Sequence, residues 1–419
     1  MQDFTALLKQ EIVPALGCTE PIAVALAVAR ATEELGDRPE RIALHVSRNI
    51  LKNAMNVGIP GTGMKGLEIA AALAAVAGHS AYGLEVLRDE TPDDVLQAKE
   101  LRSRVSVYLS DVDKPLYIKA CVSRGNDTAE CVIEDSHTGI TSVSHNSVSR
   151  PIEVVAEQHE SAAPTITPAL DLESIYEFAT QAPIDKLAFL KRGMDMNLRV
   201  AREGLEGDYG MNVGRKLYEE SPAADSDYAD YAVALAAAAA DARMGGCTLP
   251  VMSTAGSGNQ GLAATLPCIA VAERLGASDE ALLRAEAISH LITIHIKSHI
   301  GKLSALCGCA IAASVGSSCG ITYLLGGGLA EICFAVQNMI ADISGLICDG
   351  AKAGCALKLA TGVGAAVQCA RLAIAGSRAD SHDGIVTEDV ERSIANLGEL
   401  GARGMMTADK VILEMMMCK

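Results

Sequence analysis

The chain has 419 residues, enough for two or three domains, and 49% of them are hydrophobic. A formal net charge of −17 favours solubility and argues against nucleic acids and anionic membrane surfaces as partners. Its 13 cysteines are too sparse for a disulfide scaffold, which leaves buried thiols and a metal or redox site as interpretations.

Two helices are predicted over residues 3–35. DFTALLKQEIV is amphipathic, and PIAVALAVARATEELG is apolar, with Pro21 suited to a first helical position and Gly36 to a helix end. Cys18 falls in the bend between them. The segment lacks a basic stretch followed by an apolar one, so we expect no secretory signal and a cytoplasmic chain with reduced thiols. Residues 1–36 are predicted to pack on the C-terminal domain.

Residues 37–165 are predicted to form a small α+β domain. Short runs rich in β-branched residues and bounded by turn residues are typical of strands: RIALHVSRNI, RVSVYLSDV, LYIKACVSRG, AECVIEDS and TSVSHN. One helix is expected between the first two runs, over residues 63–77. The charged, proline-containing stretch 156–174 predicts a linker or domain edge.

Residues 166–419 show a helical pattern rich in Ala and Leu, with glycine-rich breaks. The predicted fold class is therefore α+β: a mainly α-helical domain with a smaller inserted α+β domain. Residues 303–330 of the helical domain carry no charge but are rich in Gly, Ser and Cys, which favours a buried core segment over a membrane helix. The alanine-rich helices favour a homo-oligomer.

Cysteines in the last third of the chain have the spacing of ligands. Cys348 and Cys355 are seven residues apart, about 10.5 Å on an unbroken helix, which is too far for adjacent ligands of one compact cluster. Gly350 and Gly354 lie between them and allow a loop that brings both sulfurs to one point. We therefore expect the helix to begin near Cys355, with its N-terminal amides facing an anionic group.

These thiols suggest two kinds of metal site. Zinc usually takes CxxC pairs or added His ligands at close spacing, and neither is seen. Three or four isolated thiolates fit an iron–sulfur cluster better, and three would hold a [4Fe–4S] cluster with one iron open to a substrate. The candidate ligands are Cys309, Cys348 and Cys355. A free cysteine is also a common buried apolar residue, which is the expected role of Cys121, Cys131, Cys268, Cys319, Cys333 and Cys369.

Cys18 stands directly before Thr19-Glu20-Pro21, at the start of a predicted helix. That position lowers a thiol pKa and favours the thiolate. Such a thiolate could serve as a base, a nucleophile or a fourth ligand; the alternative is a packed thiol at a tight bend.

Two glycine-containing loops are candidate binding sites for a small carboxylate. Glycines at a helix N-terminus free backbone amides that bind carboxylate or phosphate, and the spacing matches neither nucleotide-binding fingerprint. The alternative is a plain strand-to-helix turn. Candidate residues of the first loop are Asn53, Asn56, Gly61, Thr62, Gly63 and Lys65, and those of the second are Asn259 and Gln260. The nearby His290, His295 and His299 lack an HExxH arrangement and are expected to be core or solvated residues.

Five motifs in order resemble one known family. GCTEP, NAMNVGIPGTGMKG, GSGNQG, LSALCGCAIAASVG and CDGAKAGCALKLATG together resemble the L-cysteine desulfidase family, also called UPF0597, and are more distantly similar to the bacterial iron–sulfur L-serine dehydratases. The resemblance implies a [4Fe–4S] lyase without pyridoxal phosphate that converts L-cysteine to sulfide, ammonia and pyruvate.

The resemblance also implies roles for individual residues. It makes Cys348 and Cys355 cluster ligands and places the third ligand in the CGC motif, where Cys309 is preferred over Cys307. Cys18 corresponds to the family's proton-accepting cysteine. In the reaction this implies, the substrate thiolate binds the open iron and β-elimination follows.

The first glycine loop looks like the serine dehydratase loop that holds the substrate carboxylate. The resemblance therefore implies a carboxylate held on Gly61–Lys65, with Lys65 as a catalytic cation. The dehydratase loop is rich in Ser and His, whereas this one has Asn, Thr and Lys.

Three other functions remain open from the sequence. A serine or threonine dehydratase would use the same cluster with a hydroxyl at the open iron. A non-catalytic iron–sulfur sensor would have a fully ligated cluster, with Cys18 as the fourth ligand. A carboxylate-binding protein would hold no cluster and use its thiols only for packing.

Overall fold

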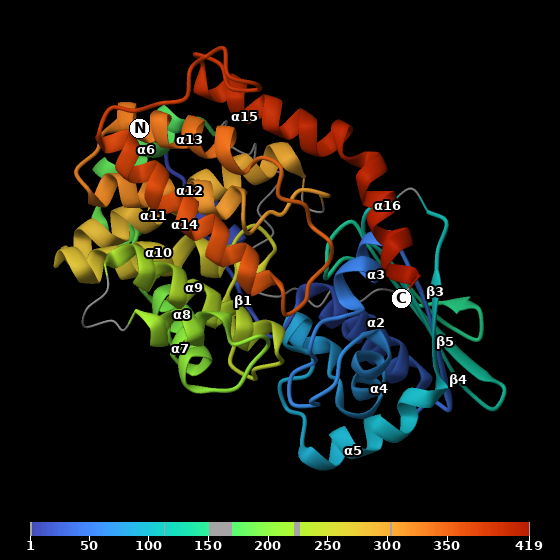
Figure 1. Ribbon diagram of the computed structural model, residues 1–419. Coiled ribbons are helices and arrows are strands. Elements are labelled where there is room, and N and C mark those ends of the chain that lie inside the picture. The colour runs from blue at the N-terminus through green and yellow to red at the C-terminus, as the bar shows by residue number, and fades with distance from the viewer. Residues whose placement is uncertain (1, 113, 151–169, 222–226, 302–303, 419) are drawn as a thin grey trace.

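A helical part and a smaller α+β part lie side by side in the computed structural model, which describes residues 2–112, 114–150, 170–221, 227–301 and 304–418 (Figure 1). The predicted α+β class with a mainly helical part is confirmed. The predicted linker at 156–174 lies largely outside the described residues.

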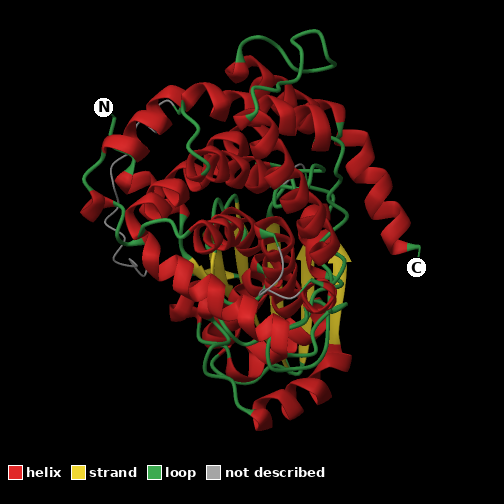
Figure 2. Ribbon diagram, turned by 60° about the vertical axis from the view of Figure 1, so that its left-hand side comes forward, coloured by secondary structure: helices red, strands yellow, loops and turns green. Residues whose placement is uncertain are grey.

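A six-stranded sheet forms the base of the α+β part, in the order β3-β2-β4-β5-β6-β7 (Figure 2, yellow). β2 and β3 are parallel, and the other neighbours are antiparallel. Burial alternates along β4, which turns Ile118, Ala120 and Val122 to one covered face. The strands are β2 (Arg41–Val46), β3 (Val105–Leu109), β4 (Tyr117–Arg124), β5 (Asp127–Glu134), β6 (Ile140–His145) and β7 (Val148–Ser149).

Helices cover one face of this sheet. The helices of this part are α2 (Thr19–Leu35), α3 (Arg48–Ala54), α4 (Leu67–Ala77) and α5 (Pro92–Leu101). α2 packs on β4, β5 and α4, and it ends at Gly36, whose φ of 77° requires the left-handed region, as predicted. Between β2 and β3 the chain forms three α-helices where the sequence predicted one. The run RIALHVSRNI, predicted as a strand, leaves the sheet at Val46, and its polar end begins α3.

The two N-terminal helices lie in different parts of the molecule. α1 (Thr5–Glu11) contacts α11 of the helical part. The prediction that α2 also packs there is wrong: α2 is buried along nearly its whole length, and its small apolar residues fit between the sheet and α4.

The helical part is built around α12 (Ala312–Leu324), which lies among α10, α11, α13 and α14. Most of residues 305–322 of the uncharged stretch are buried, as predicted, whereas most of residues 323–330 are half-buried or exposed. A short antiparallel pair, β1 (Pro14–Ala15) with β8 (Val251–Met252), was not predicted. The other helices are α6 (Leu172–Gln181), α7 (Leu190–Glu206), α8 (Val213–Glu220), α9 (Tyr228–Met244), α10 (Gly258–Leu275), α11 (Asp279–Ile300), α13 (Leu329–Ile343), α14 (Cys355–Ile374) and α15 (Val390–Glu399).

One helix among the described residues, α14, is long and apolar enough to cross a membrane. It packs against α9, α12 and α13, and 44% of its apolar window is buried. A core helix passes the same test of length and composition, so this finding alone is weak evidence for a membrane span.

The last helix, α16 (Met406–Met417), runs from the helical part to the α+β part (Figure 1, red). There it contacts α3, and Asp409 forms an ion pair with Lys52, whose side chain is 2% exposed. This pair ties the C-terminal end of the chain to the α+β part.

Substituting Gly204 should lower stability, because α7 lies directly against α9 there. A Cβ at Gly204 would lie 2.0 Å from the carbonyl oxygen of Ala238. We expect Gly204→Ala to lower the free energy of unfolding by about 1–3 kcal/mol, measured by urea denaturation. Gly364→Ala on α14 is the control, because its Cβ would have only Val233 nearby, at 3.8 Å. It should be neutral or gain up to about 1 kcal/mol; equal losses in both variants would contradict the packing described here.

Candidate functional site

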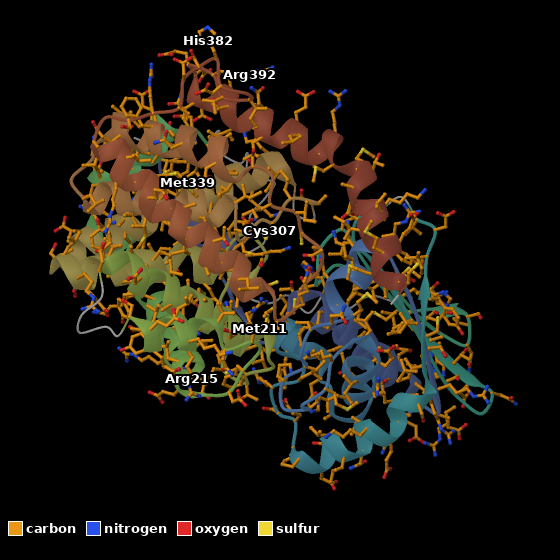
Figure 3. All side chains as sticks on the ribbon, viewed as in Figure 1. Met211, Arg215, Cys307, Met339, His382 and Arg392 are labelled. Atoms are coloured by element: carbon orange, nitrogen blue, oxygen red, sulfur yellow. The ribbon has the colours of Figure 1, made fainter. Side chains whose placement is uncertain are left out.

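A cavity of about 610 Å³ lies between the helical part and the α+β part. Its volume is within the range of roughly 300–1,000 Å³ found for small-molecule sites. Figure 3 labels Cys307 in this region. The charged, amide and thiol side chains that line the cavity include Cys18, Glu20, Asn53, His137, Arg243, Asn259, Gln260, Lys297, Cys307, Cys309, Cys348, Cys355 and Lys358.

A short backbone bridge brings the two cysteine-containing segments together. Leu306 and Ile347 pair as an isolated antiparallel bridge. On either side of it, the Cys307 amide donates to the Leu346 carbonyl at 2.9 Å, and the Cys348 amide donates to the Ala305 carbonyl at 2.6 Å. Cys307 and Cys348 are thus held beside one another although forty residues of chain separate them.

The CGC motif forms a tight pair of thiols. The sulfur atoms of Cys307 and Cys309 are 3.4 Å apart. A hydrogen bond from Cys309 lowers the pKa of Cys307 to about 6, and the same contact together with burial raises the pKa of Cys309. Gly308 lies between them with no room for a side chain, because a Cβ would stand 2.2 Å from Oε1 of Gln260. The motif is therefore fixed against the first turn of α10.

The loop from Cys348 to Cys355 turns at Gly350, whose φ is 87°. A Cβ there would also lie 2.2 Å from the carbonyl oxygen of Lys52, so the predicted need for glycine is confirmed at this position. Gly354 has ordinary helical angles, and a Cβ there would make only an ordinary contact with the Lys352 side chain, at 3.6 Å, so it is not the second hinge that the sequence suggested. As predicted, α14 begins at Cys355.

Cys18 belongs to a buried hydrogen-bonded group centred on Glu20. Its Sγ donates to Oε2 of Glu20 at 3.1 Å, and Thr19 Oγ1 donates to the same oxygen at 3.0 Å. Nδ2 of Asn53 donates to the other oxygen, Oε1, at 3.1 Å. Cys18 and Thr19 at the start of α2, together with Asn53 of α3, thus hold one carboxylate at the cavity wall.

The prediction that the helix start favours a Cys18 thiolate is wrong. Burial, followed by the charge of Glu20, raises the pKa of the Cys18 thiol well above its usual value. Burial also acts to raise the pKa of Glu20, but the charge of His137 and the hydrogen bonds that Glu20 accepts outweigh it, so this pKa is lowered. The pair is therefore a neutral thiol donating to a carboxylate.

Cationic and amide side chains from α9 and α10 also line the cavity. Arg243, at the end of α9, donates from Nη1 to Oδ1 of Asn259 at 3.0 Å and from Nη2 to the Gly17 carbonyl at 2.8 Å. Gln260 donates from Nε2 to the carbonyls of Thr254 and Ala255, at 2.8 and 3.1 Å. The predicted residues Asn259 and Gln260 are therefore in the cavity, on the first turn of α10.

Lys297 faces the cysteines from α11. Its Nζ donates to the Gly301 carbonyl at 2.7 Å. Burial lowers the pKa of Lys297 to about 8, while the thiols of Cys348, Cys307 and Cys309 act in the other direction. The positive charge of Lys297 therefore lies near the thiols of Cys348, Cys307 and Cys309.

Most of the first glycine loop does not line the cavity. Asn53 does, but Asn56, Gly61, Thr62, Gly63 and Lys65 do not, and of these only Thr62 is buried. Thr62 donates to the Ile59 carbonyl within the loop, and Gly58 donates to the Met244 carbonyl at the end of α9. The placement of a carboxylate on Gly61–Lys65 is thus not supported. The glycines let the loop close on itself and approach the α9 backbone.

Of the three histidines of α11, His290 and His295 are buried and His299 is exposed, which agrees with the prediction of core or solvated residues. Nδ1 of His290 lies 2.9 Å from Oγ1 of Thr254, and its Nε2 lies 3.3 Å from the buried Glu286 carboxyl group. Nε2 of His295 pairs with Glu391 of α15 at 2.7 Å. Burial lowers the pKa of His290 to about 4, so it is a neutral support for the loop before α10.

Sequence reasoning missed several charged residues of the cavity, among them the buried Glu20, Arg243 and Lys297. Each gives a signal in retrospect, because each is a charge inside an otherwise apolar, buried helical segment. Such charges are retained at a cost unless they are paired or face a polar site.

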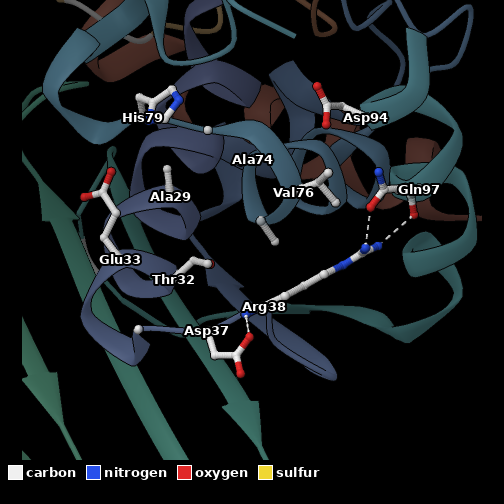
Figure 4. A pocket seen from close by; sticks show the side chains of 13 residues that line it. Ala29, Thr32, Glu33, Asp37, Arg38, Ala74, Val76, His79, Asp94 and Gln97 are labelled. Atoms are coloured by element: carbon white, nitrogen blue, oxygen red, sulfur yellow. Dashed lines mark hydrogen bonds between the residues drawn. The ribbon is translucent and has the colours of Figure 1, made fainter. Parts of the chain in front are cut away.

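A second hollow, of about 520 Å³, lies in the α+β part (Figure 4). Arg38 crosses it and donates to Oε1 of Gln97 at 2.6 Å and to the Gln97 carbonyl at 3.2 Å. Glu33, Asp37 and Asp94 also line it. It contains no cysteine and none of the residues predicted to form a site.

Comparison with known proteins identifies the family of the chain. The family described as "Serine dehydratase alpha chain" matches residues 65–414. UPF0597 proteins are similar over nearly the whole length. One from Bacteroides fragilis (strain YCH46) is 46% identical, covering 98% of this chain and 96% of its own, and one from Phocaeicola vulgatus is 47% identical, covering 99% and 97%. One from Oleidesulfovibrio alaskensis is 45% identical, covering 99% and 97%.

The match therefore places the chain among proteins of the serine dehydratase alpha-chain type. It belongs to the UPF0597 family, which is related to the iron–sulfur serine dehydratases.

The donor set of the cavity fits an iron–sulfur cluster. Four cysteine sulfurs from two bridged segments line it, and Lys297 and Lys358 supply positive charge beside them. In the part of the chain that the structure describes, no group of three or more His, Cys, Asp or Glu side chains is placed to hold a single metal ion. A four-iron cluster does not need such a group, because each cysteine binds a different iron.

Gly308→Ala should disturb the CGC turn, because the new Cβ would press on Gln260. We expect a loss of about 1–3 kcal/mol in the free energy of unfolding and a lower iron content after anaerobic reconstitution. Gly345→Ala is the matched control, since a Cβ there would meet nothing within 4 Å. If Gly308→Ala matched wild type in both measurements, the tight contact would not be important for the site.

Proposed function

We propose that this protein is an iron–sulfur lyase that converts L-cysteine to hydrogen sulfide, ammonia and pyruvate. The observation that carries the proposal is one buried cavity that combines four thiols with a carboxylate–thiol pair and an arginine. Membership of a family related to the iron–sulfur serine dehydratases supports a lyase. The sulfur-containing substrate is the part of the proposal that rests on the resemblance of the motifs.

Cys309, Cys348 and Cys355 would hold a [4Fe–4S] cluster in this proposal. When bound by three cysteines, such a cluster supplies one iron as a Lewis acid for the leaving sulfur. Cys307 is the alternative third ligand, because both sulfurs of the CGC motif line the cavity, 3.4 Å apart.

The proton-accepting role is assigned to Cys18 together with Glu20. The thiol already donates to the Glu20 carboxylate, so it can pass its proton to Oε2 while the sulfur accepts the α-proton of the substrate. The pair then holds one additional proton, and the substrate loses its α-proton and its sulfide. The aminoacrylate that remains hydrolyses in water to pyruvate and ammonia.

The cellular setting is part of the same proposal. All 13 cysteines are free thiols, which suits a reducing compartment such as the cytoplasm. A homo-oligomer is proposed from the alanine-rich helices. Nucleic acid and membrane partners are not expected at this net charge.

A serine or threonine dehydratase is the second candidate, favoured by the description of the matching family. Anaerobic assays of 2-oxo acid formation from L-cysteine, L-serine and L-threonine separate the two. The main proposal expects sulfide and pyruvate from L-cysteine as the fastest reaction. Faster turnover of L-serine or L-threonine would contradict it.

Removing a ligand should remove the cluster. After anaerobic reconstitution we expect about four iron and four sulfide per wild-type chain. Cys348→Ala and Cys355→Ala should lose most of both, whereas Cys268→Ala, a buried thiol of α10, should retain them. Cys307→Ala and Cys309→Ala, measured in parallel, identify the third ligand. Absence of iron from the wild-type protein would rule out the proposed function and leave the cluster-free alternative.

Cys18→Ser should keep the cluster and lose most activity. Loss of a general base costs about 10²–10⁴-fold in rate, so a fall of this size in kcat with unchanged iron content is expected. Cys121→Ser is the matched control, because Cys121 also donates to a carboxylate, Oε1 of Glu130, but lies on the sheet outside the cavity. Loss of iron in Cys18→Ser would instead indicate a fourth ligand, as expected of a sensor.

A further inference from the structure

The cavity has a negative wall and a positive wall, formed by different parts of the chain. Glu20 and Asn53 come from α2 and α3 of the α+β part, whereas Arg243 and Asn259 come from α9 and α10 of the helical part. All four side chains are buried, at 8%, 8%, 4% and 4% exposure respectively. Buried charges of this kind are costly unless they meet a complementary partner.

The negative wall retains acceptor capacity. The Glu20 carboxylate has about four lone-pair sites and accepts from three side chains and from its own backbone amide, so it contributes negative charge rather than a free acceptor. Oδ1 of the neighbouring Asn53 is buried and accepts no hydrogen bond within the described residues. A free acceptor on Asn53 beside the negative charge of Glu20 suits an ammonium group, which is positively charged and has three donors.

The positive wall retains donor capacity. A guanidinium group has five N–H donors, and Arg243 uses one for Asn259 and one for Gly17. Its Nε is buried without an acceptor in the part of the chain that is described. Because its Oδ1 accepts from Arg243, Asn259 is oriented with its amide group as a further donor beside the guanidinium.

The other cations of the cavity are directed elsewhere. Lys297 donates to the Gly301 carbonyl, and the groups whose charges act on it are first the thiols of Cys348 and the CGC motif and then Glu20. Lys358 donates to the Ile347 carbonyl and forms an ion pair with Asp349. Arg243 is therefore the cation best placed to bind a carboxylate away from the cysteines.

We propose that the cavity selects a zwitterionic α-amino acid, with Glu20 and Asn53 binding its α-ammonium group and Arg243 and Asn259 binding its α-carboxylate. This assignment rests on the proposed function for the identity of the site. It replaces the first glycine loop as the carboxylate site, and it leaves the substrate side chain free to face the four cysteines. Specificity for an amino acid then comes from two walls that belong to different parts of the fold.

Calorimetric titration of the anaerobically reconstituted full chain tests this assignment with ligands that have no leaving group. The probes are L-alanine, which carries both charged groups, propionate, which lacks the ammonium group, and ethylamine, which lacks the carboxylate. Wild type should bind L-alanine at least about tenfold more tightly than either of the others, because each lacks a charge-assisted hydrogen bond in a buried site.

Variants should lose these two preferences separately. Glu20→Gln should lower the preference for L-alanine over propionate by about tenfold or more and leave the preference over ethylamine near wild type. Arg243→Gln should do the reverse. Asn53→Ala and Asn259→Ala should show the same two patterns more weakly, and they keep the test open if an Arg243 variant fails to fold. Glu11→Gln, a carboxylate elsewhere on the cavity lining, is the matched control and should change neither preference.

Three results would overturn the assignment: no binding of L-alanine to wild type, unchanged preferences in all four variants, or equal loss of both preferences in each variant. Because the ligands are not substrates, these results are independent of whether sulfide is produced. Failure of the proposed function would instead appear as absent iron or absent sulfide formation.

Discussion

The antiparallel backbone bridge between residues 305–307 and 346–348 is the constraint on which the site depends. It forms where two loops leave α11 and α13, and it places Cys307 beside Cys348. Gly308 and Gly350 complete the arrangement, because each lies against a neighbouring group at a distance that only glycine permits. Thiols that are distant in sequence thus converge because of main-chain geometry.

The cavity lies where the two parts of the molecule meet, and each part contributes a different chemistry. The α+β part supplies the carboxylate–thiol pair of Glu20 and Cys18, whereas the helical part supplies the cysteines of the two loops and Arg243. The ion pair between Lys52 and Asp409, together with the β1–β8 pair, ties the parts to each other. Stability of this junction and function of the cavity are therefore linked.

Local patterns in the sequence were sufficient for the fold class, most strands, the helix start at Cys355 and the gathering of the last-third cysteines. They failed where tertiary contacts decide. The first glycine loop has the composition of an anion site, but its backbone is used to approach the end of α9. Cys18 has the position of an activated thiol, but burial beside Glu20 reverses the expected effect on its pKa. Arg243 was missed because nothing local relates it to residues 17–20.

Mössbauer spectroscopy of the ⁵⁷Fe-reconstituted protein, with and without L-cysteine under anaerobic conditions, tests the central claim most directly. A cluster held by three cysteines has one iron without a protein thiolate. The account predicts that L-cysteine changes the signal of that one iron site and leaves the other three unchanged. A spectrum with four equivalent irons that does not respond to L-cysteine would contradict it.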